Sequence, residues 1–562
     1  MNKDTKKVQT TNGIITLTDK DYKAAGGQGV VYCKDGIAYK IYHDPKNMIP
    51  VAKIQELGTL QRDNILGPKE PLYDPKDHTA VGFSMPYVDS TEFLCKIFTR
   101  NFRDLKNVGP QDIVDMVFDM QQTLEYIHSK GFLVVDYNEM NFLLGPDMRI
   151  VFHIDVDSWK TPSFPAMALM ESVRDRKSKK GVFTELTDWF SFAVVTFQMY
   201  VGIHPYKGFH PKFAPAEWSK RMDAGISVFD KDVDLPKSCQ DFSVIPKKHL
   251  EWYKALFVKG ERSIPPYPDA LTIAIRAGQT ISSQGGFVVE LIKEFPTPIQ
   301  KIYFFNNVRY VLTNDGIYKD DAVCMPLKKS IERTPFEMVP VFGEDPLLCY
   351  LTSGQVRFFD LSKNPLDTSS AEAMTWANDA IYFVNNGELI EGTFERFGKL
   401  LYRNKVVSGV CPSYKMHPGI VVQDDFMKCH LAIPFAKGLC ANIHVTELDG
   451  YRIIDAKHEG FVTVLVAEKG GDFYRYVLCF DKNFSHYDPW MEQLTGPVAI
   501  NFIALENGLH VLADDDKITL FKDKSAKKEI KKTPVDSSKR LYHHGMDVYF
   551  IDGTKLYRLK MS

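Results

Sequence analysis

Three acidic or amide side chains lie near one another in the sequence, where they could hold a metal ion and accept a proton. Asn141 follows Asp136 by five residues, and Asp155 comes after a short apolar run. Carboxylate and amide oxygens are ligands that Mg²⁺ prefers, and a carboxylate can take a proton from a hydroxyl group. Each residue taken alone is more often a turn residue or a cap, so the hypothesis depends on the ordered set.

A glycine cluster and a lysine earlier in the chain could hold phosphates. Glycines such as Gly26, Gly27 and Gly29 allow a strand–turn–strand backbone to approach phosphate oxygens closely. In the next predicted strand, Ala38 and Lys40 share one face. Ala38 would leave room for an adenine ring, and Lys40 could reach the α- and β-phosphates. A plain hairpin with a solvated lysine is the alternative for these residues taken alone.

Together these motifs resemble the protein kinase superfamily, and they are most similar to a divergent bacterial branch of Ser/Thr-kinase-like proteins. The resemblance covers roughly residues 20–275. Beyond the glycines and Lys40, it is carried by Pro71–Asp74, Val81–Pro86, Asp136–Asn141, Ile154–Trp159, Asp188–Ala193 and Gly202–Tyr206. It implies a bilobal α+β domain that binds ATP and Mg²⁺ and phosphorylates serine or threonine in a protein substrate.

The resemblance also implies a role for individual residues. Asp136 would act as the catalytic base, with Lys40 at the phosphates and Asn138 near the γ-phosphate. Asn141 and Asp155 would hold Mg²⁺. The implied nucleotide-binding residues are Gly26, Gly27, Gly29, Val31, Ala38, Lys40, Glu56, Met85, Tyr87 and Val88.

Further roles follow from the same resemblance. Met85 would be the gatekeeper of the adenine site, and Glu56 would pair with Lys40. Glu171 would pair with Arg262, and Asp188 would anchor its helix to the loop that carries the base.

Three departures from the kinase pattern keep more than one function open. Val134 and Val135 stand where His-Arg is usual, so activation by phosphorylation of a loop is not expected. Asn138 stands where a lysine is usual, and Val156-Asp157 replaces Phe-Gly. The first hypothesis is an active protein kinase. The alternatives are a binding or scaffold protein with an inert or nucleotide-sensing kinase fold, and a small-molecule kinase.

Two helices are predicted in this half of the chain. Apolar residues at helical spacing mark one helix that ends near His128, and a second, apolar nearly all round, is expected over Asp188–Tyr200. The first pattern consists of Ile113, Met116, Val117, Met120, Leu124 and Ile127.

The sequence changes character after Gly285. Short apolar runs alternate with turns rich in Asn, Asp and Gly at intervals of roughly 40 residues, which suits one four-stranded propeller blade per repeat. The runs are Ile302–Leu312, Leu347–Phe359, Ile381–Ile390, Val421–Ile433, Val462–Phe480, Phe502–Phe521 and Val548–Leu559. We expect two domains, a kinase-like domain at 1–275 and a β-propeller of about seven blades at 285–562. Sequential β-sandwiches are the alternative. To close a ring, Val288–Ile292 should pair beside Val548–Leu559.

Composition bounds the partners and the compartment. The chain has 562 residues, of which 44% are hydrophobic and 25% charged, and a formal net charge of -2, which argues against nucleic acid as a partner. No apolar run is long enough to suggest a membrane partner. The nine cysteines lack metal-ligand spacing and indicate a cytoplasmic protein with reduced thiols. The propeller is expected to bind a protein or peptide. His543-His544 could suggest a metal site, but adjacent strand residues point to opposite faces.

Overall fold

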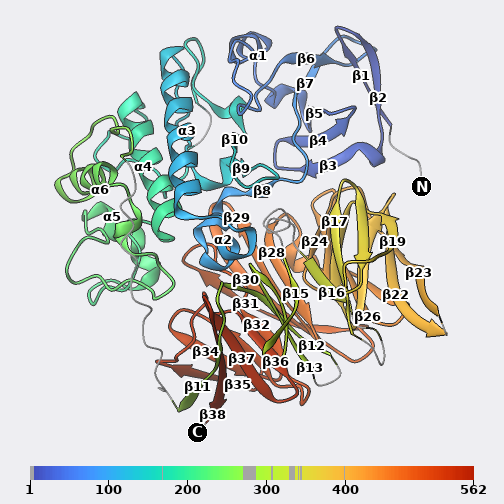
Figure 1. Cartoon of the computed structure of the whole chain (residues 1–562). Helices are drawn as coiled ribbons and strands as arrows, with labels where there is room; N and C mark the ends of the chain where they lie inside the picture. Colours follow the sequence, from blue (N-terminus) through green and yellow to red (C-terminus); the bar gives the residue numbers. More distant parts are fainter. Residues whose placement is uncertain are drawn as a thin grey trace. The chain divides into compact units, whose positions relative to one another are not determined.

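The chain forms two compact units, one comprising residues 1–277 and the other nearly all of residues 278–562. The first unit is α+β and the second is all-β, so the multidomain prediction is confirmed at this level (Figure 1). The expected boundaries at residues 275 and 285 lie outside the described residues. The computed structural model describes residues 5–166, 169–269, 286–305, 308–327, 336–339, 341, 345–397 and 399–561.

In the first unit, a large sheet and one short helix form one part, and a small sheet lies beside the remaining helices (Figure 1). The strands are β1 (Lys6–Thr10), β2 (Gly13–Leu17), β3 (Tyr22–Ala25), β4 (Gly29–Lys34), β5 (Ile37–Tyr42), β6 (Glu70–Tyr73), β7 (Ala80–Pro86), β8 (Glu92–Phe93), β9 (Phe142–Leu144) and β10 (Val151–His153). The α-helices are α1 (Val51–Leu57), α2 (Arg100–Lys106), α3 (Pro110–Ser129), α4 (Glu185–Val201), α5 (Trp218–Asp223) and α6 (Lys247–Lys254). An antiparallel sheet has the order β2-β1-β6-β7-β5-β4-β3, and a small sheet has the order β10-β9-β8.

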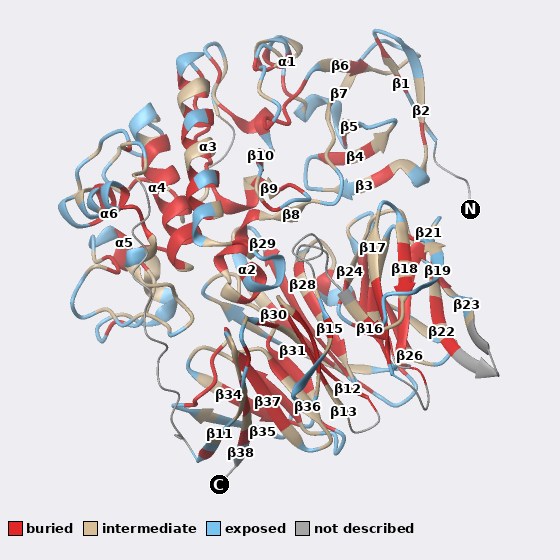
Figure 2. Ribbon diagram, viewed as in Figure 1, coloured by how far each residue is buried: buried red, intermediate tan, exposed pale blue. Residues whose placement is uncertain are grey.

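Both predicted helices are confirmed, as α3 and α4. Pro110 begins α3, and Asp112 accepts a hydrogen bond of 2.8 Å from the backbone N–H of Gly109 at its cap. All six apolar residues of the predicted helical pattern are buried on one side of α3. Helix α4 is buried along most of its length (Figure 2), and it ends at Gly202 with φ of +89°. A Cβ at Gly202 would lie 2.6 Å from the carbonyl oxygen of Phe98, so glycine suits this position.

The described part of the second unit consists of seven four-stranded antiparallel sheets. In chain order, the first three are β12 (Ile299–Phe305), β13 (Val308–Thr313), β14 (Gly316–Lys319), β15 (Ala322–Pro326); β16 (Phe336–Val339), β17 (Leu347–Thr352), β18 (Gln355–Phe359), β19 (Pro365–Ser370); and β20 (Ala373–Ala377), β21 (Ala380–Asn385), β22 (Glu388–Phe397), β23 (Lys399–Gly409). The next three are β24 (Tyr414–His417), β25 (Ile420–Asp425), β26 (Lys428–Ala436), β27 (Leu439–His444); β28 (Arg452–Glu459), β29 (Val462–Lys469), β30 (Asp472–Phe480), β31 (Tyr487–Leu494); and β32 (Phe502–Ala504), β33 (His510–Ala513), β34 (Lys517–Phe521), β35 (Lys527–Lys531). The seventh contains β36 (Leu541–His544), β37 (Asp547–Asp552), β38 (Lys555–Met561) and the early strand β11 (Phe287–Glu294).

The seven apolar runs found in the sequence are paired strands, as expected. The pairing of Val288–Ile292 with the last run is also confirmed, because β11 lies antiparallel to β38 with Val289 opposite Leu559. The seventh sheet therefore joins the first strand of the unit to its last three strands.

Each sheet of the second unit shares a buried apolar cluster with the next sheet in the chain. Tyr303 of β12, for example, packs in one cluster with Met338 of β16. The series does not stop at the seventh sheet, because Leu556 of β38 packs with Ile302 of β12. Seven such clusters link the sheets in a cycle of neighbours.

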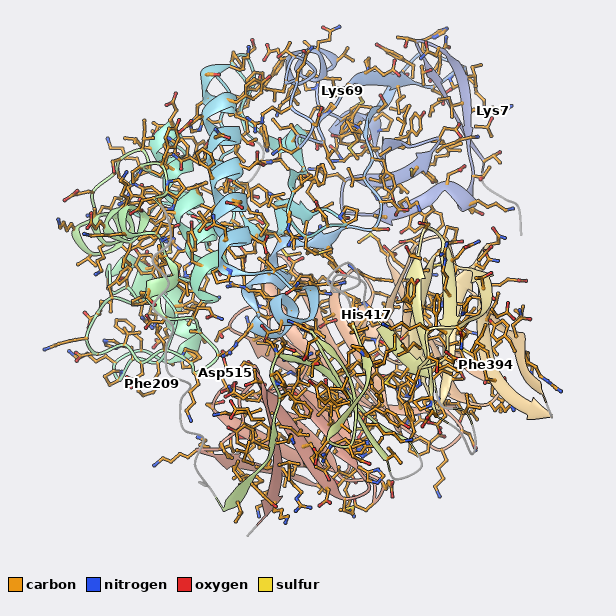
Figure 3. The ribbon with its side chains drawn as sticks, viewed as in Figure 1. Lys7, Lys69, Phe209, Phe394, His417 and Asp515 are labelled. Atoms are coloured by element: carbon orange, nitrogen blue, oxygen red, sulfur yellow. The ribbon has the colours of Figure 1, made fainter. Side chains whose placement is uncertain are left out.

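Polar side chains on or just before the first strands of two sheets add contacts between neighbouring sheets. His417 of β24 lies 3.1 Å from a carboxylate oxygen of Asp455 on β28 (Figure 3). Arg540, which precedes β36, donates a hydrogen bond of 2.8 Å to the carbonyl oxygen of Ile299 on β12. These contacts follow the same order of sheets as the apolar clusters.

Two further expectations can be compared with the structure. His543 lies 3.2 Å from Glu459, whereas the ring of His544 stacks on Phe304, so the two histidines do not converge on one site. Each of the nine cysteines, all within the described residues, is a free thiol. Among the described helices, none combines the length and the apolar composition needed to cross a bilayer.

We predict that Leu556→Ala destabilises the second unit by about 3 kcal/mol, because Leu556 is fully buried where the last and first sheets meet. Urea unfolding followed by pulsed hydrogen exchange would report each unit separately. Val323→Ala, at a side chain that is 53% exposed on β15, is the matched control and should change stability by less than about 0.5 kcal/mol. Equal unfolding midpoints for Leu556→Ala and the control would contradict this packing.

Candidate active site

The glycine turn between β3 and β4 has open space beside the backbone at Gly26 and Gly27. The N–H of Gly26 donates a hydrogen bond of 2.9 Å to the carbonyl oxygen of Gly29. A Cβ at Gly26 or Gly27 would meet nothing within 4 Å, whereas a Cβ at Gly29 would lie 2.3 Å from the carbonyl oxygen of Ile41. Gly29 is thus required by the close approach of β5, and Gly26 and Gly27 leave space beside the backbone.

The residues predicted to surround adenine share one face of the sheet. Val31 is opposite Lys40, and Ala38 is opposite Met85, and paired residues on antiparallel strands point to the same side. The other face carries a buried apolar cluster that includes Tyr39. Strand alternation therefore brings Val31, Ala38, Lys40 and Met85 together, away from that core.

The segment after β7 carries two of the predicted nucleotide-binding residues, Tyr87 and Val88. Tyr87 and Val88 are both half-buried. The hydroxyl group of Tyr87 donates a hydrogen bond of 3.2 Å to Asp89, and burial raises its pKa above the ordinary value. A contact with adenine stays a prediction for both residues.

Lys40 makes its closest ion pair with Asp157. Its Nζ lies 2.6 Å from Oδ2 of Asp157 and 3.9 Å from Oδ1 of Asp155. Tyr42, two residues after Lys40, donates a hydrogen bond of 2.9 Å to the same Oδ2. Burial and the Asp157 carboxylate raise the pKa of Tyr42 well above its ordinary value, so it stays a donor at neutral pH.

The expected pair between Glu56 and Lys40 is wrong. Glu56 on α1 accepts a hydrogen bond of 3.4 Å from the N–H of Ser163, and hydrogen bonds from Ser163 and Thr161 lower its pKa. The acid that pairs with Lys40 is Asp157, which lies in the short 3₁₀ turn Val156–Ser158 after β10. The sequence shows two carboxylates there, and the spacing alone does not say which one reaches the lysine.

The loop from Asp136 to Asn141 is closed by its own hydrogen bonds. Nδ2 of Asn141 donates to the carbonyl oxygen of Asp136 at 2.9 Å and to its carboxylate at 3.3 Å. The other carboxylate oxygen of Asp136 accepts a hydrogen bond of 2.7 Å from the N–H of Met170. The predicted base and the predicted metal ligand thus lie in direct contact.

The side chain of Asn138 is buried within this loop and supports its backbone. Its side chain is 1% exposed, and its Oδ1 accepts a hydrogen bond of 2.9 Å from the N–H of Met140, which caps the short 3₁₀ turn Glu139–Asn141. The structure therefore gives Asn138 a supporting contact. A role at the γ-phosphate stays a prediction.

Asp188 anchors the loop as expected. Its carboxylate is fully buried at the start of α4 and accepts hydrogen bonds of 2.8 and 2.9 Å from the N–H groups of Val134 and Val135. Nε2 of His128 lies 3.0 Å from the same carboxylate. Val135 has φ of +66°, a region that is costly for a β-branched residue. The buried carboxylate fixes this turn immediately before Asp136.

Asp155 lies at the turn between β10 and the 3₁₀ turn Val156–Ser158. It adopts a left-handed conformation, with φ of +55°, and its side chain is 43% exposed. The N–H of Ile154 donates a hydrogen bond of 3.0 Å to the carbonyl oxygen of Asn141, so the two predicted metal ligands come from joined segments. A carboxylate oxygen and an amide oxygen are both suitable ligands for Mg²⁺.

Arg262 pairs with Asp175, so the expected pair with Glu171 is also wrong. Two guanidinium nitrogens of Arg262 lie 2.7 and 2.6 Å from the two carboxylate oxygens of Asp175, which is nearly fully buried. Glu171 is 58% exposed and pairs instead with Arg174 and Arg176. The guanidinium group of Arg262 can form two parallel hydrogen bonds with the buried carboxylate of Asp175. The two residues are far apart in the sequence, so no local pattern indicated that they pair.

The comparisons with known proteins give partial matches to kinases. The chain is 26% identical over 225 residues to "Protein kinase YegI" of Escherichia coli strain K12, which covers 36% of this chain and 34% of that protein. It is 24% identical over 173 residues to "Serine/threonine/tyrosine-protein kinase HT1" of Arabidopsis thaliana, covering 27% of this chain and 39% of that protein. The chain thus spans between a third and two-fifths of the length of these relatives. No protein-family model matches it.

We predict that Asp188→Asn lowers the free energy of unfolding of the first unit by about 3 kcal/mol, because an amide cannot accept all the hydrogen bonds that the buried carboxylate receives. Asp223→Asn is the control, since this carboxylate is 59% exposed in a surface ion pair and should cost less than about 1 kcal/mol. Denaturant unfolding measures both. Similar costs for the two variants would contradict the anchoring role of Asp188.

We also predict a pH dependence that comes from His153 at the end of β10. Its ring is fully buried, and burial lowers its pKa to about 3 although the backbone of Asn64 opposes this shift. The unfolded state then binds a proton at His153 more readily than the folded state does. The contribution of His153 to the free energy of unfolding is therefore complete above about pH 6.5 and falls by about 1.4 kcal/mol per pH unit below that value. His153→Leu should remove this slope from unfolding free energies measured between pH 6.5 and 4. An unchanged slope would show that His153 does not titrate this way.

Proposed function

We propose that the first unit is an ATP- and Mg²⁺-dependent protein kinase that acts on serine or threonine. One observation carries this proposal. The loop of Asp136 and Asn141 is hydrogen-bonded to the segment before Asp155, and Asp155 approaches Lys40 to 3.9 Å. Four residues that phosphate transfer would require, Lys40, Asp136, Asn141 and Asp155, therefore converge, and the relatives named as kinases support the same proposal.

The side chains of this unit have complementary tasks in that reaction. Lys40 holds phosphate oxygens from the face of β5, and Val31, Ala38 and Met85 bound the adenine on the same face. Asn141 and Asp155 would hold Mg²⁺, which neutralises charge on the phosphates when bound. Asp136 accepts the proton of the substrate hydroxyl through a carboxylate whose Oδ1 also accepts a hydrogen bond from the N–H of Met170.

We propose that the second unit is a closed seven-bladed β-propeller that binds a protein or peptide. The cycle of apolar clusters supports the ring, and so does the pairing of β11 with β38. Recognition of a protein or peptide rests on analogy with other propellers.

A nucleotide-binding scaffold is the second candidate function. It is favoured by the contact between Asp136 and the N–H of Met170, which engages one of the two oxygens of the proposed base. Asn138 stands where kinases usually have a lysine near the γ-phosphate, and this departure also favours a scaffold. Binding of nucleotide without transfer is the property that separates this candidate from the kinase.

Incubation with labelled ATP and Mg²⁺ tests the proposal. Asp136→Asn should lower phosphate transfer to the protein itself or to an added protein by about 10²-fold or more while ADP still binds, because the base acts on the acceptor hydroxyl. Asp155→Ala should weaken binding of the metal–nucleotide pair. Asp147→Asn, at an exposed loop residue, is the control and should transfer phosphate as wild type does.

The outcomes separate the candidates. Equal transfer by wild type and Asp136→Asn would show that Asp136 is not the base. ADP binding without any transfer by wild type would favour the scaffold, and no ADP binding would refute both.

A further inference from the structure

Two carboxylates stand beside Lys40, and they differ in burial and contact. Asp157 is 5% exposed and lies 2.6 Å from Nζ, whereas Asp155 is 43% exposed and lies 3.9 Å away. A buried carboxylate held at hydrogen-bond distance gives a lysine a fixed position. An accessible carboxylate at the edge of the site can instead exchange its contacts for a metal ion.

Tyr42 fixes Asp157 from the same strand that carries Lys40. Its hydroxyl group donates to the carboxylate oxygen that binds Nζ, at 2.9 Å. Lys40 and Tyr42 are separated by one residue on β5, so both side chains lie on the face that meets Asp157. The carboxylate is therefore held from two sides by one rigid strand.

Helix α1 contributes a second lysine near this site. Lys53 is 2% exposed, and its Nζ donates to the carbonyl oxygen of Pro165 at 3.3 Å. Burial lowers its pKa, while the charges of Asp157 and Asp155 oppose that shift. The acid of this helix, Glu56, bonds to Ser163 instead. Asp157 is thus the buried anion nearest to Lys40.

We propose that Asp157 is the positioning residue of Lys40, so that the two acids of the segment Asp155-Val156-Asp157 have separate tasks. Asp157 holds the lysine that binds the phosphates, and the more exposed carboxylate of Asp155 would bind the metal ion. This inference rests on the proposed kinase function, because positioning matters only where Lys40 binds a nucleotide.

The first test needs no nucleotide. Lys40 is labelled with a small amine-reactive reagent in the nucleotide-free chain, and its rate is compared by mass spectrometry with that of Lys46 in the same sample. Asp157→Asn should raise the relative rate about fivefold, because a buried ion pair shields the amine and its loss frees it. Glu56→Gln is the matched control and should change the rate less than about twofold.

The second test measures ADP affinity in the presence of Mg²⁺. Asp157→Asn should weaken binding about tenfold, Asp157→Glu should restore most of the loss, and Tyr42→Phe should lie between them and wild type. Rescue by glutamate would separate a positioning carboxylate from a side chain that only fills space. Asp147→Asn, at an exposed loop residue, should bind as wild type does.

The results separate failure of this inference from failure of the proposed function. Wild-type binding of ADP together with unchanged labelling and affinity in Asp157→Asn would overturn only the role of Asp157. Absence of ADP binding by wild type would overturn both. If Asp157→Asn does not fold, the double variant Lys40→Met/Asp157→Asn decides, because removing both charges should restore folding and an unfolded double variant would contradict the pair.

Discussion

The buried carboxylate of Asp188 is the interaction on which the rest of the candidate site depends. It receives two backbone N–H groups from a turn that Val135 enters at positive φ, and the residue after that turn is Asp136. Without this acceptor, two buried donors would lose their partner and the turn would relax toward ordinary angles. Helix α4 is buried nearly all round, so it offers the carboxylate a rigid support.

A second constraint comes from the sheet. Strand alternation sets Lys40 and Tyr42 on the face opposite the apolar cluster, and the turn after β10 brings Asp157 to them. The two constraints meet where the N–H of Ile154 bonds to the carbonyl oxygen of Asn141. Lys40 on its strand and Asp136 on its loop are thereby connected through a short stretch of backbone, which would hold the two residues in place for the proposed phosphate transfer.

The sequence predicted features that depend on local pattern and missed those that depend on long-range choice. Helices α3 and α4, the hairpins of the second unit and the pairing of β11 with β38 follow from periodicity and from the need to close an edge. The partner of Lys40 does not follow from such a pattern. Asp155 and Asp157 are the same type of residue, and only the left-handed conformation at Asp155 turns Asp157 toward the lysine. Asp175 was missed for a similar reason, since several acids precede α4 and burial alone distinguishes the one that binds Arg262.

The most direct measurement of the central claim is electron paramagnetic resonance of Mn²⁺, added in place of Mg²⁺ with and without ADP. If Lys40, Asn141 and Asp155 form a metal–nucleotide site, Mn²⁺ should bind tightly to wild type only when ADP is present. Asp155→Asn should abolish this ADP-dependent binding of Mn²⁺, and Asp136→Asn should retain it. Mn²⁺ binding that is independent of ADP, or that is unchanged in Asp155→Asn, would contradict the account.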